Sequence, residues 1–205
     1  MKINNNTWNK IRYTLYAPGY DIAGRIFDKS RKKSIDSAEI KPGDKVLIIG
    51  AGTGLDLDFL PVNCEITATD LTPSMIERTK KRNKTLNHHL NAIVMDGQNL
   101  QFTNDSFDVV ILHLILAVIP DPIACIKEAE RLLKQNGKAI VFDKFVPKNK
   151  KITYMRKLAN VFTNFIASDI TRTFESIASQ SNLMIVSDIE ADFNGNFRLI
   201  KLIKN

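Results

Sequence analysis

The chain of 205 residues is poor in the groups that disulfide-rich, metal-binding and membrane-spanning proteins use. Cys64 and Cys125 are too few for a disulfide framework, and we interpret them as reduced thiols of a cytoplasmic protein. His88 and His89 are adjacent in a polar stretch, where we expect them at the surface. Neither has a cysteine at the spacing of a metal site. The sequence also lacks an apolar run of about 20 residues, the length of a membrane-spanning helix, and its first residues contain no apolar signal core.

The charge is unbalanced, because 29 lysines and arginines against 22 aspartates and glutamates give a net charge of +7. An anionic partner, either a nucleic acid or a membrane surface, is one explanation. The basic residues are spread along the chain, however, and solvated helix faces explain them equally well. No nucleic-acid-binding motif is evident. With 44% hydrophobic and 25% charged residues, the composition predicts one globular domain over residues 1–205.

The most informative stretch is 46–54, in which four apolar residues run into glycines at positions 50, 52 and 54. This pattern predicts a buried parallel strand that ends in a tight turn, where a backbone without Cβ atoms can approach a ligand. No lysine follows the glycines as a phosphate-binding loop requires, and Leu55 stands where a dinucleotide-binding loop has its third glycine. The remaining common candidate ligand is S-adenosylmethionine, which has no phosphate.

Two acidic residues follow predicted strands and are candidate ligand contacts. Asp70 ends the run 66–70 and follows Gly52 by 18 positions, about the 20-residue gap at which an acid meets ribose hydroxyls in nucleotide-binding βαβ units. Asp96 precedes Gly97 after the run 92–95. Either acid could instead be a turn residue, but the order of the two favours ligand binding.

Apolar runs alternate with helical stretches along the rest of the chain. Strands are predicted at 46–49, 66–70, 92–95, 107–112, 138–142, 183–189 and 197–203. One helix is predicted to begin at Thr72, a plausible N-cap, and another to end at about Leu133. Two more helices are predicted over 151–165 and 171–179. The pattern predicts an α/β fold: a Rossmann-like, seven-stranded, mostly parallel sheet with a C-terminal antiparallel hairpin, and helices on both faces.

These motifs resemble those of the class I S-adenosylmethionine-dependent methyltransferases over residues 41–205. The matching segments are 46–54, 69–75, 96–100, 107–110 and 131–138. Within that superfamily, 16–21 and 52–57 are most similar to bacterial phospholipid N-methyltransferases and ubiquinone/menaquinone C-methyltransferases.

The resemblance implies a Rossmann-like fold, S-adenosyl-L-methionine as the cofactor, and a set of cofactor-binding residues. Asp70 would bind the ribose, and Asp96 the adenine amino group. The full implied set is Gly50, Ala51, Gly52, Gly54, Asp70, Leu71, Met75, Asp96, Gly97 and His113.

One position departs from the family pattern. Ile48 stands where the family has an acid that helps to hold the methionine end of the cofactor. Asp56 is a candidate substitute, although Asp56 and Asp58 are also placed to cap a helix. Alternatively, the departure marks weaker binding or a protein that binds the cofactor without catalysis.

His113 is the candidate catalytic residue. It follows an apolar run at the carboxyl end of the predicted fourth strand, where ligands bind in open α/β sheets, and imidazole accepts protons near neutral pH. The alternative is a histidine that only packs over the cofactor or caps the strand.

Residues 1–40 are predicted to form a helical lid over the cofactor, as the resembling families imply, with Tyr16 and Tyr20 facing the substrate. The alternative is that these residues simply cover the sheet. The basic amphipathic stretch 148–165 either lies on an anionic membrane or packs on the domain.

The sequence therefore predicts an S-adenosylmethionine-dependent methyltransferase whose acceptor is a small or lipid-like molecule such as a phospholipid amine. It would be cytoplasmic, with peripheral contact at the inner face of the membrane as a further expectation. The alternatives are a tRNA or protein methyltransferase that uses the basic surface, and a non-catalytic S-adenosylmethionine-binding protein.

Overall fold

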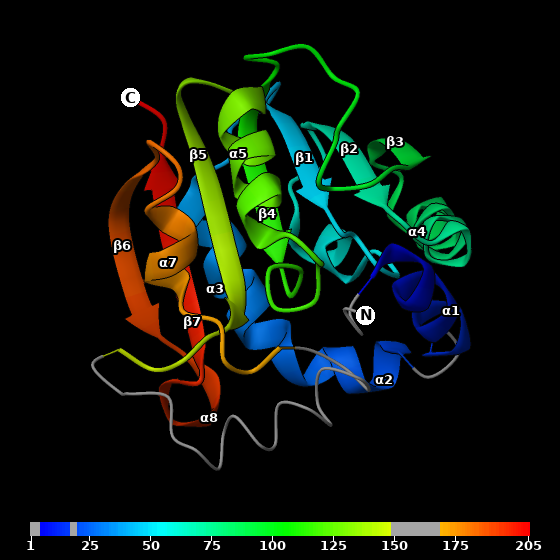
Figure 1. The fold of residues 1–205 in the computed structure, drawn as a ribbon. Helices are drawn as coiled ribbons and strands as arrows, with labels where there is room; N and C mark the ends of the chain where they lie inside the picture. Colours follow the sequence, from blue (N-terminus) through cyan, green and yellow to red (C-terminus); the bar gives the residue numbers. More distant parts are fainter. Residues whose placement is uncertain (1–4, 17–19, 149–168) are drawn as a thin grey trace.

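The computed structural model of the chain describes residues 5–16, 20–148 and 169–205, which form one seven-stranded sheet in the order β3-β2-β1-β4-β5-β7-β6 (Figure 1). Its strands are β1 (Lys45–Ile49), β2 (Glu65–Asp70), β3 (His89–Val94), β4 (Phe107–His113), β5 (Leu133–Lys144), β6 (Met184–Glu190) and β7 (Phe197–Ile203). Only β7 runs antiparallel to its neighbours β5 and β6. The predicted fold class, a mostly parallel sheet closed by antiparallel pairing at the C-terminus, is confirmed.

Helices cover both faces of this sheet (Figure 1). They are α1 (Asn6–Tyr16), α2 (Tyr20–Gly24), α3 (Asp28–Ala38), α4 (Pro73–Leu86), α5 (Pro122–Leu132), α7 (Phe174–Ala178) and α8 (Asp192–Gly195), with 3-10 turns η1 (Arg25–Phe27) and η2 (Leu55–Phe59). The apolar faces of α5 and α7 share one core with β1, β4 and β5, and α3 packs into a second core on the opposite face. Burial on both faces explains why β1 and β4 are continuous apolar runs rather than alternating ones.

Several element boundaries differ from those predicted. β5 begins at Leu133, five residues before the predicted start, because Leu133 pairs with Phe107 of β4 ahead of a register irregularity. The turn between β6 and β7 is wound into the short helix α8. α4 begins with Pro73 at its first turn, as predicted, but the Thr72 side chain makes no cap hydrogen bond. The predicted helix 151–165 lies outside the described residues.

The surface position expected for His88 is wrong, whereas His89 is exposed. His88 is buried, and its Nε2 lies 2.9 Å from the carbonyl oxygen of Leu57. The polar sequence around His88 does not indicate this contact, because the partner is 31 residues away along the chain. Among the described residues, no helix has the length and apolar character needed to cross a bilayer.

Candidate functional site

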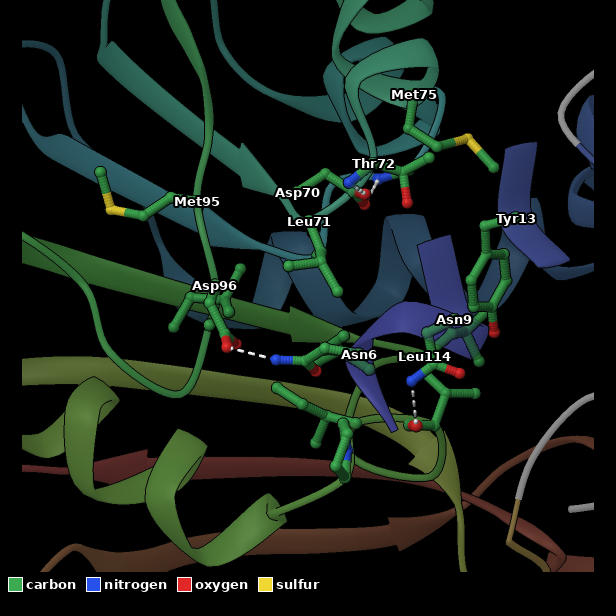
Figure 2. Close-up of a pocket in the computed structure, with 18 residues that line it drawn as sticks. Asn6, Asn9, Tyr13, Asp70, Leu71, Thr72, Met75, Met95, Asp96 and Leu114 are labelled. Atoms are coloured by element: carbon green, nitrogen blue, oxygen red, sulfur yellow. Dashed lines mark hydrogen bonds between the residues drawn. The ribbon is translucent and has the colours of Figure 1, made fainter. Parts of the chain in front are cut away.

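A pocket opens at the carboxyl ends of β1, β2 and β4, the edge where parallel sheets bind ligands (Figure 2). The described residues that line it are Asn6, Asn9, Tyr13, Ile49, Gly50, Gly52, Asp70, Leu71, Thr72, Met75, Met95, Asp96, Gly97, Leu114, Ile115, Val118, Ile119 and Pro120. Seven of the predicted cofactor residues are in this set: Gly50, Gly52, Asp70, Leu71, Met75, Asp96 and Gly97. Ala51, Gly54 and His113 are not in it. The structure thus gathers segments that are far apart in sequence into one site.

The carboxylate of Asp70 is fixed by the backbone around it. Its Oδ2 accepts a hydrogen bond from the Gly52 N–H at 2.9 Å, and its Oδ1 accepts one from the Thr72 N–H at 2.8 Å. Burial raises the pKa of Asp70, and these backbone hydrogen bonds oppose that rise. Each oxygen keeps a second lone pair, so the carboxylate can accept one hydroxyl at each oxygen. This geometry suits the two hydroxyls of a ribose.

Glycine is required at two points of the pocket wall. At Gly50 the backbone has φ of +75°, and an added Cβ would lie 2.7 Å from Cδ1 of Ile115. At Gly97 an added Cβ would lie 2.6 Å from Cγ2 of Ile49. A side chain at either position would collide with a neighbour that lines the pocket, so the tight packing of this wall requires glycine.

Asp96 is engaged by the amino-terminal helix. Its Oδ2 accepts a hydrogen bond from the Asn6 amide at 2.6 Å, and Figure 2 shows the two side chains pointing at each other. Its Oδ1 accepts one from the Gln98 N–H at 3.0 Å. The Asn6 group is an NH₂ donor, which is the chemistry of an adenine amino group. Asp96 is therefore positioned to accept from either.

Helix α1 covers the pocket through Asn6, Asn9 and Tyr13, which share one helix face at spacings of three and four. The pocket volume is about 70 Å³ with α1 in place, room for a handful of water molecules at roughly 10–15 Å³ each. A nucleoside-sized ligand therefore needs the α1 side chains that line the pocket to shift. The sequence analysis missed these three residues, although their helical spacing could have indicated them.

The two tyrosines singled out by sequence have other surroundings. Tyr16 is 40% exposed and is not among the described residues of the pocket wall. The side chain of Tyr20 lies outside the described residues. Within 1–40, α3 is part of the layer that covers the sheet, since Ile35 and Ala38 are buried in the core. The lid role of this region stays a prediction.

The loop after β4, which supplies Leu114, Ile115 and Val118 to the pocket, is held from behind by Asp143 at the end of β5. The buried carboxylate accepts hydrogen bonds from the Ala117 N–H at 2.9 Å and the Lys144 N–H at 2.7 Å. Burial raises its pKa to about 6, against the hydrogen bonds and the charges of Lys144 and Arg172.

We expect Asp143→Asn to change the pH dependence of stability. Between pH 6 and 4 the folded chain takes up a proton at Asp143 that the unfolded chain does not. The contribution of Asp143 to the free energy of unfolding therefore increases as pH falls, by roughly 3 kcal/mol at most. The neutral amide of the variant lacks this gain, and it also loses about 1 kcal/mol of hydrogen bonding at every pH. Urea unfolding at pH 4 and pH 7 measures the difference between the proteins. If that difference is the same at both pH values, Asp143 does not titrate in this range.

His113 lies behind the pocket wall in a buried polar network. Its Nδ1 is 2.8 Å from Oδ1 of Asp56, and its Nε2 is 2.9 Å from the Ser34 hydroxyl. Arg31 donates to the same Asp56 oxygen at 2.7 Å. Burial opposes ionisation of Asp56, but the charges and hydrogen bonds of His113 and Arg31 outweigh it and hold the Asp56 pKa below its usual value. Both His113 nitrogens thus have protein partners, and its role as a base stays a prediction.

The position of His113 leads us to expect a structural effect from His113→Ala. The substitution leaves Ser34 and Asp56 without this partner, at a cost of about 1–3 kcal/mol. Chemical denaturation measures that loss. Turnover of the folded fraction is the second readout: a large fall in rate with unchanged stability, together with a wild-type rate that declines at acid pH, would identify His113 as the base instead.

Ile48 stands where the family pattern has an acid, and Asp56 is the candidate substitute for that acid. Ile48 is 1% exposed and packs in the core beneath α3. Asp56 is committed to Arg31 and His113 and is not among the described pocket residues. It does not cap η2 either. Asn6 and Asn9 of α1 are polar side chains that line this pocket (Figure 2).

Comparison with known proteins agrees with this architecture. Residues 47–141 match the family described as "Methyltransferase domain". A phosphatidylethanolamine N-methyltransferase of Cereibacter sphaeroides is 21% identical over 187 residues, 89% of this chain and 91% of that protein. A ubiquinone/menaquinone biosynthesis C-methyltransferase UbiE of Shewanella woodyi is 30% identical over 139 residues, 65% of this chain. That match spans only 54% of the UbiE protein.

Solved structures show the same fold. A geranyl diphosphate methyltransferase in complex with S-adenosylmethionine superposes with a TM-score of 0.74 at 13% sequence identity, over 89% of this chain and 87% of its own. At that identity the likeness concerns the fold alone.

Proposed function

We propose that the chain binds S-adenosylmethionine in the pocket of Figure 2 and transfers its methyl group to a small or lipid-like acceptor. The match of residues 47–141 to the methyltransferase family supports this proposal. The observation that carries this proposal is Asp70. Its two oxygens are held by backbone N–H groups beside glycines that leave the ligand space open.

The pocket residues divide the work of binding. Asp70 accepts the ribose hydroxyls, and Asp96 accepts the adenine amino group. Apolar side chains of the lining, among them Leu71, Met75 and Ile119, would pack against the base. When bound, the cofactor supplies a methyl group on a positively charged sulfur, which is already a good electrophile. The protein therefore needs mainly to orient the acceptor and exclude water, and orientation alone can supply about 7–11 kcal/mol.

Water exclusion falls to α1 and to the loop after β4. Tyr13 and Asn9 of α1 line the pocket together with Leu114 and Ile115 of this loop, and Asn9 donates to the Val118 carbonyl at 3.3 Å. A general base is needed only for an acceptor that carries a proton at the moment of attack. An amine in its neutral form needs none before attack, which fits a site in which His113 is committed to Asp56.

A lipid-like acceptor is supported by the outer surface of α1, α2 and η1. Ile11, Leu15, Ile22 and Ile26 are 50%, 71%, 82% and 63% exposed. Large apolar side chains on the helices next to the pocket suit contact with a membrane, where a lipid would enter. The names of two relatives, a phosphatidylethanolamine methyltransferase and a quinone methyltransferase, support the same acceptor class.

The membrane contact predicts binding to anionic vesicles. Each Lys or Arg near such a surface contributes about 1 kcal/mol, and salt screens this attraction within a Debye length. We expect flotation with anionic vesicles in low salt, a sharp fall by about 0.5 M salt, and poor binding to neutral vesicles. The pair Leu15→Gln and Ile22→Gln should weaken binding, whereas Val62→Gln, 58% exposed beyond η2, should not. Absence of flotation in low salt would move the acceptor from lipids to water-soluble molecules.

The acceptor itself is identified by label transfer. Full-length protein is incubated with methyl-labelled S-adenosylmethionine and fractionated cell extract, with Asp70→Ala as the control that should transfer nothing. We expect label in the lipid or small-molecule fraction. Label in RNA or protein would overturn the proposed acceptor class. Cofactor binding with no transfer to any fraction would make this a non-catalytic binding protein.

A further inference from the structure

A second cavity lies outside the cofactor pocket, between α2, the glycine loop and α4. It is an open groove of about 360 Å³, lined by Asp21, Thr53, Arg78, Lys81, Arg82 and Thr85. It shares no lining residue with the cofactor pocket, although Gly52 on the same loop lines that pocket. The four α4 residues recur at spacings of three and four, so one helix face forms the floor of the groove.

The groove is lined mainly by positively charged side chains, and some of them have no ion-pair partner in the described part of the chain. Arg82 donates to Asp21 at 2.6 Å, to Asp58 at 2.9 Å and to the Thr53 carbonyl at 3.1 Å. The side chains of Arg78 and Lys81, in contrast, form no ion pair or hydrogen bond within the described part of the chain. Three cations thus face one carboxylate, that of Asp21, and two of the three cations are available to a ligand.

A hydroxyl in the wall also lacks a partner. Thr53 is 2% exposed, and its Oγ1 makes no hydrogen bond to any described residue. A buried hydroxyl without a partner is energetically unfavourable. Because Thr53 lines the groove, this hydroxyl is a candidate donor to a ligand that is rich in acceptor atoms.

We propose that this groove binds a phosphoryl group. Arg78 offers a planar fork of N–H donors, Lys81 a compact charge and Thr53 a hydroxyl, and a phosphoryl group has several acceptor oxygens that can use all three at once. The single carboxylate in the wall, Asp21, is already neutralised by Arg82. The proposal concerns binding only and does not depend on methyl transfer or on the cofactor.

Two sources can supply this chemistry, a phospholipid headgroup and free phosphate. The groove borders α2, where Ile22 is 82% exposed and follows Asp21 directly. A headgroup in the groove would therefore sit beside an apolar side chain that can enter the bilayer, and this favours the phospholipid.

The test is a titration of the full chain with phosphate, in which binding is measured by calorimetry or by the chemical shifts of the Arg78 side chain. We expect the pair Arg78→Gln and Lys81→Gln to lower the affinity for inorganic phosphate by about tenfold. The matched control is the pair Lys80→Gln and Lys84→Gln. It removes the same charge from exposed positions of the same helix and should change the affinity by less than about twofold. Circular dichroism shows that each variant folds.

Equal losses in the two pairs would mean that phosphate senses only the net charge, and would overturn the site. So would an absence of phosphate binding to the wild-type chain in low salt. The two sources are then separated with vesicles. Phosphatidylglycerol vesicles that compete with phosphate, and bind the Arg78/Lys81 variant less well than the control variant, identify the headgroup. Phosphate binding that such vesicles leave unchanged identifies free phosphate or a soluble phosphate ester.

Discussion

Replacing Asp70 by alanine should weaken S-adenosylmethionine binding by more than a hundredfold. The variant loses two charge-assisted hydrogen bonds to the ribose, each worth about 1.5–3 kcal/mol, and about 2.7 kcal/mol corresponds to a hundredfold in affinity. It also frees the Gly52 and Thr72 N–H groups that Asp70 holds. Calorimetry with S-adenosylmethionine and S-adenosylhomocysteine measures the loss, and the wild-type chain should not bind NAD.

Two controls make this measurement specific. Asp70→Asn keeps one carbonyl acceptor and should bind better than the alanine variant, while Asp105→Ala removes an exposed acid far from the pocket and should bind as the wild type does. Burial raises the pKa of Asp70, so the carboxylate takes up a proton at a higher pH than an exposed aspartate does. The affinity of the wild-type chain should therefore begin to decline at that higher pH. Unchanged affinity in the alanine variant would show that the ribose binds elsewhere.

The second large effect is on stability. Asp56→Ala removes the carboxylate that lies between Arg31 and His113, both nearly inaccessible to solvent. Breaking a buried ion pair by deleting one partner destabilises a protein by about 3–5 kcal/mol, because the other charge stays buried. We expect a loss of that size in urea unfolding at neutral pH. Asp36→Ala, which breaks an exposed pair with Lys32 on the same helix as Arg31, should lose at most about 0.5 kcal/mol.

The pH dependence of this loss follows from the lowered pKa of Asp56. The carboxylate contributes its stability above the unfolded-state pKa of about 4, and that contribution is lost as pH falls towards the lower folded-state value. The gap between wild type and variant should therefore narrow below pH 4. A gap that is small at neutral pH would mean that Arg31 and His113 find adequate partners without Asp56.

The parts of the fold that sequence predicts are those set by local chemistry. The apolar run 46–49 and the glycines after it can only be a buried strand that turns sharply, and Asp70 and Asp96 follow their strands at the sheet edge where ligands bind. These features need no knowledge of distant partners, so the fold class and most of the pocket floor could be inferred.

The parts that sequence missed depend on partners far along the chain. His113 meets Asp56 and Ser34 at separations of 57 and 79 residues, and no periodicity signals such pairs. The pocket-facing side of α1 was misjudged for another reason. An amphipathic helix is expected to turn its apolar residues inward, yet Ile11 and Leu15 face solvent while the polar Asn6 and Asn9 cover the pocket.

The Asn6 amide occupies the Asp96 oxygen that an adenine amino group would use, so α1 and the proposed cofactor compete for the same acceptor. If the cofactor binds only after this hydrogen bond has opened, its apparent dissociation constant equals the intrinsic one divided by the fraction of open molecules. One hydrogen bond of about 1.4 kcal/mol would leave roughly a tenth of the molecules open. An environment that holds Ile11 and Leu15 more tightly in the open form would raise cofactor affinity up to that tenfold limit without touching the cofactor pocket.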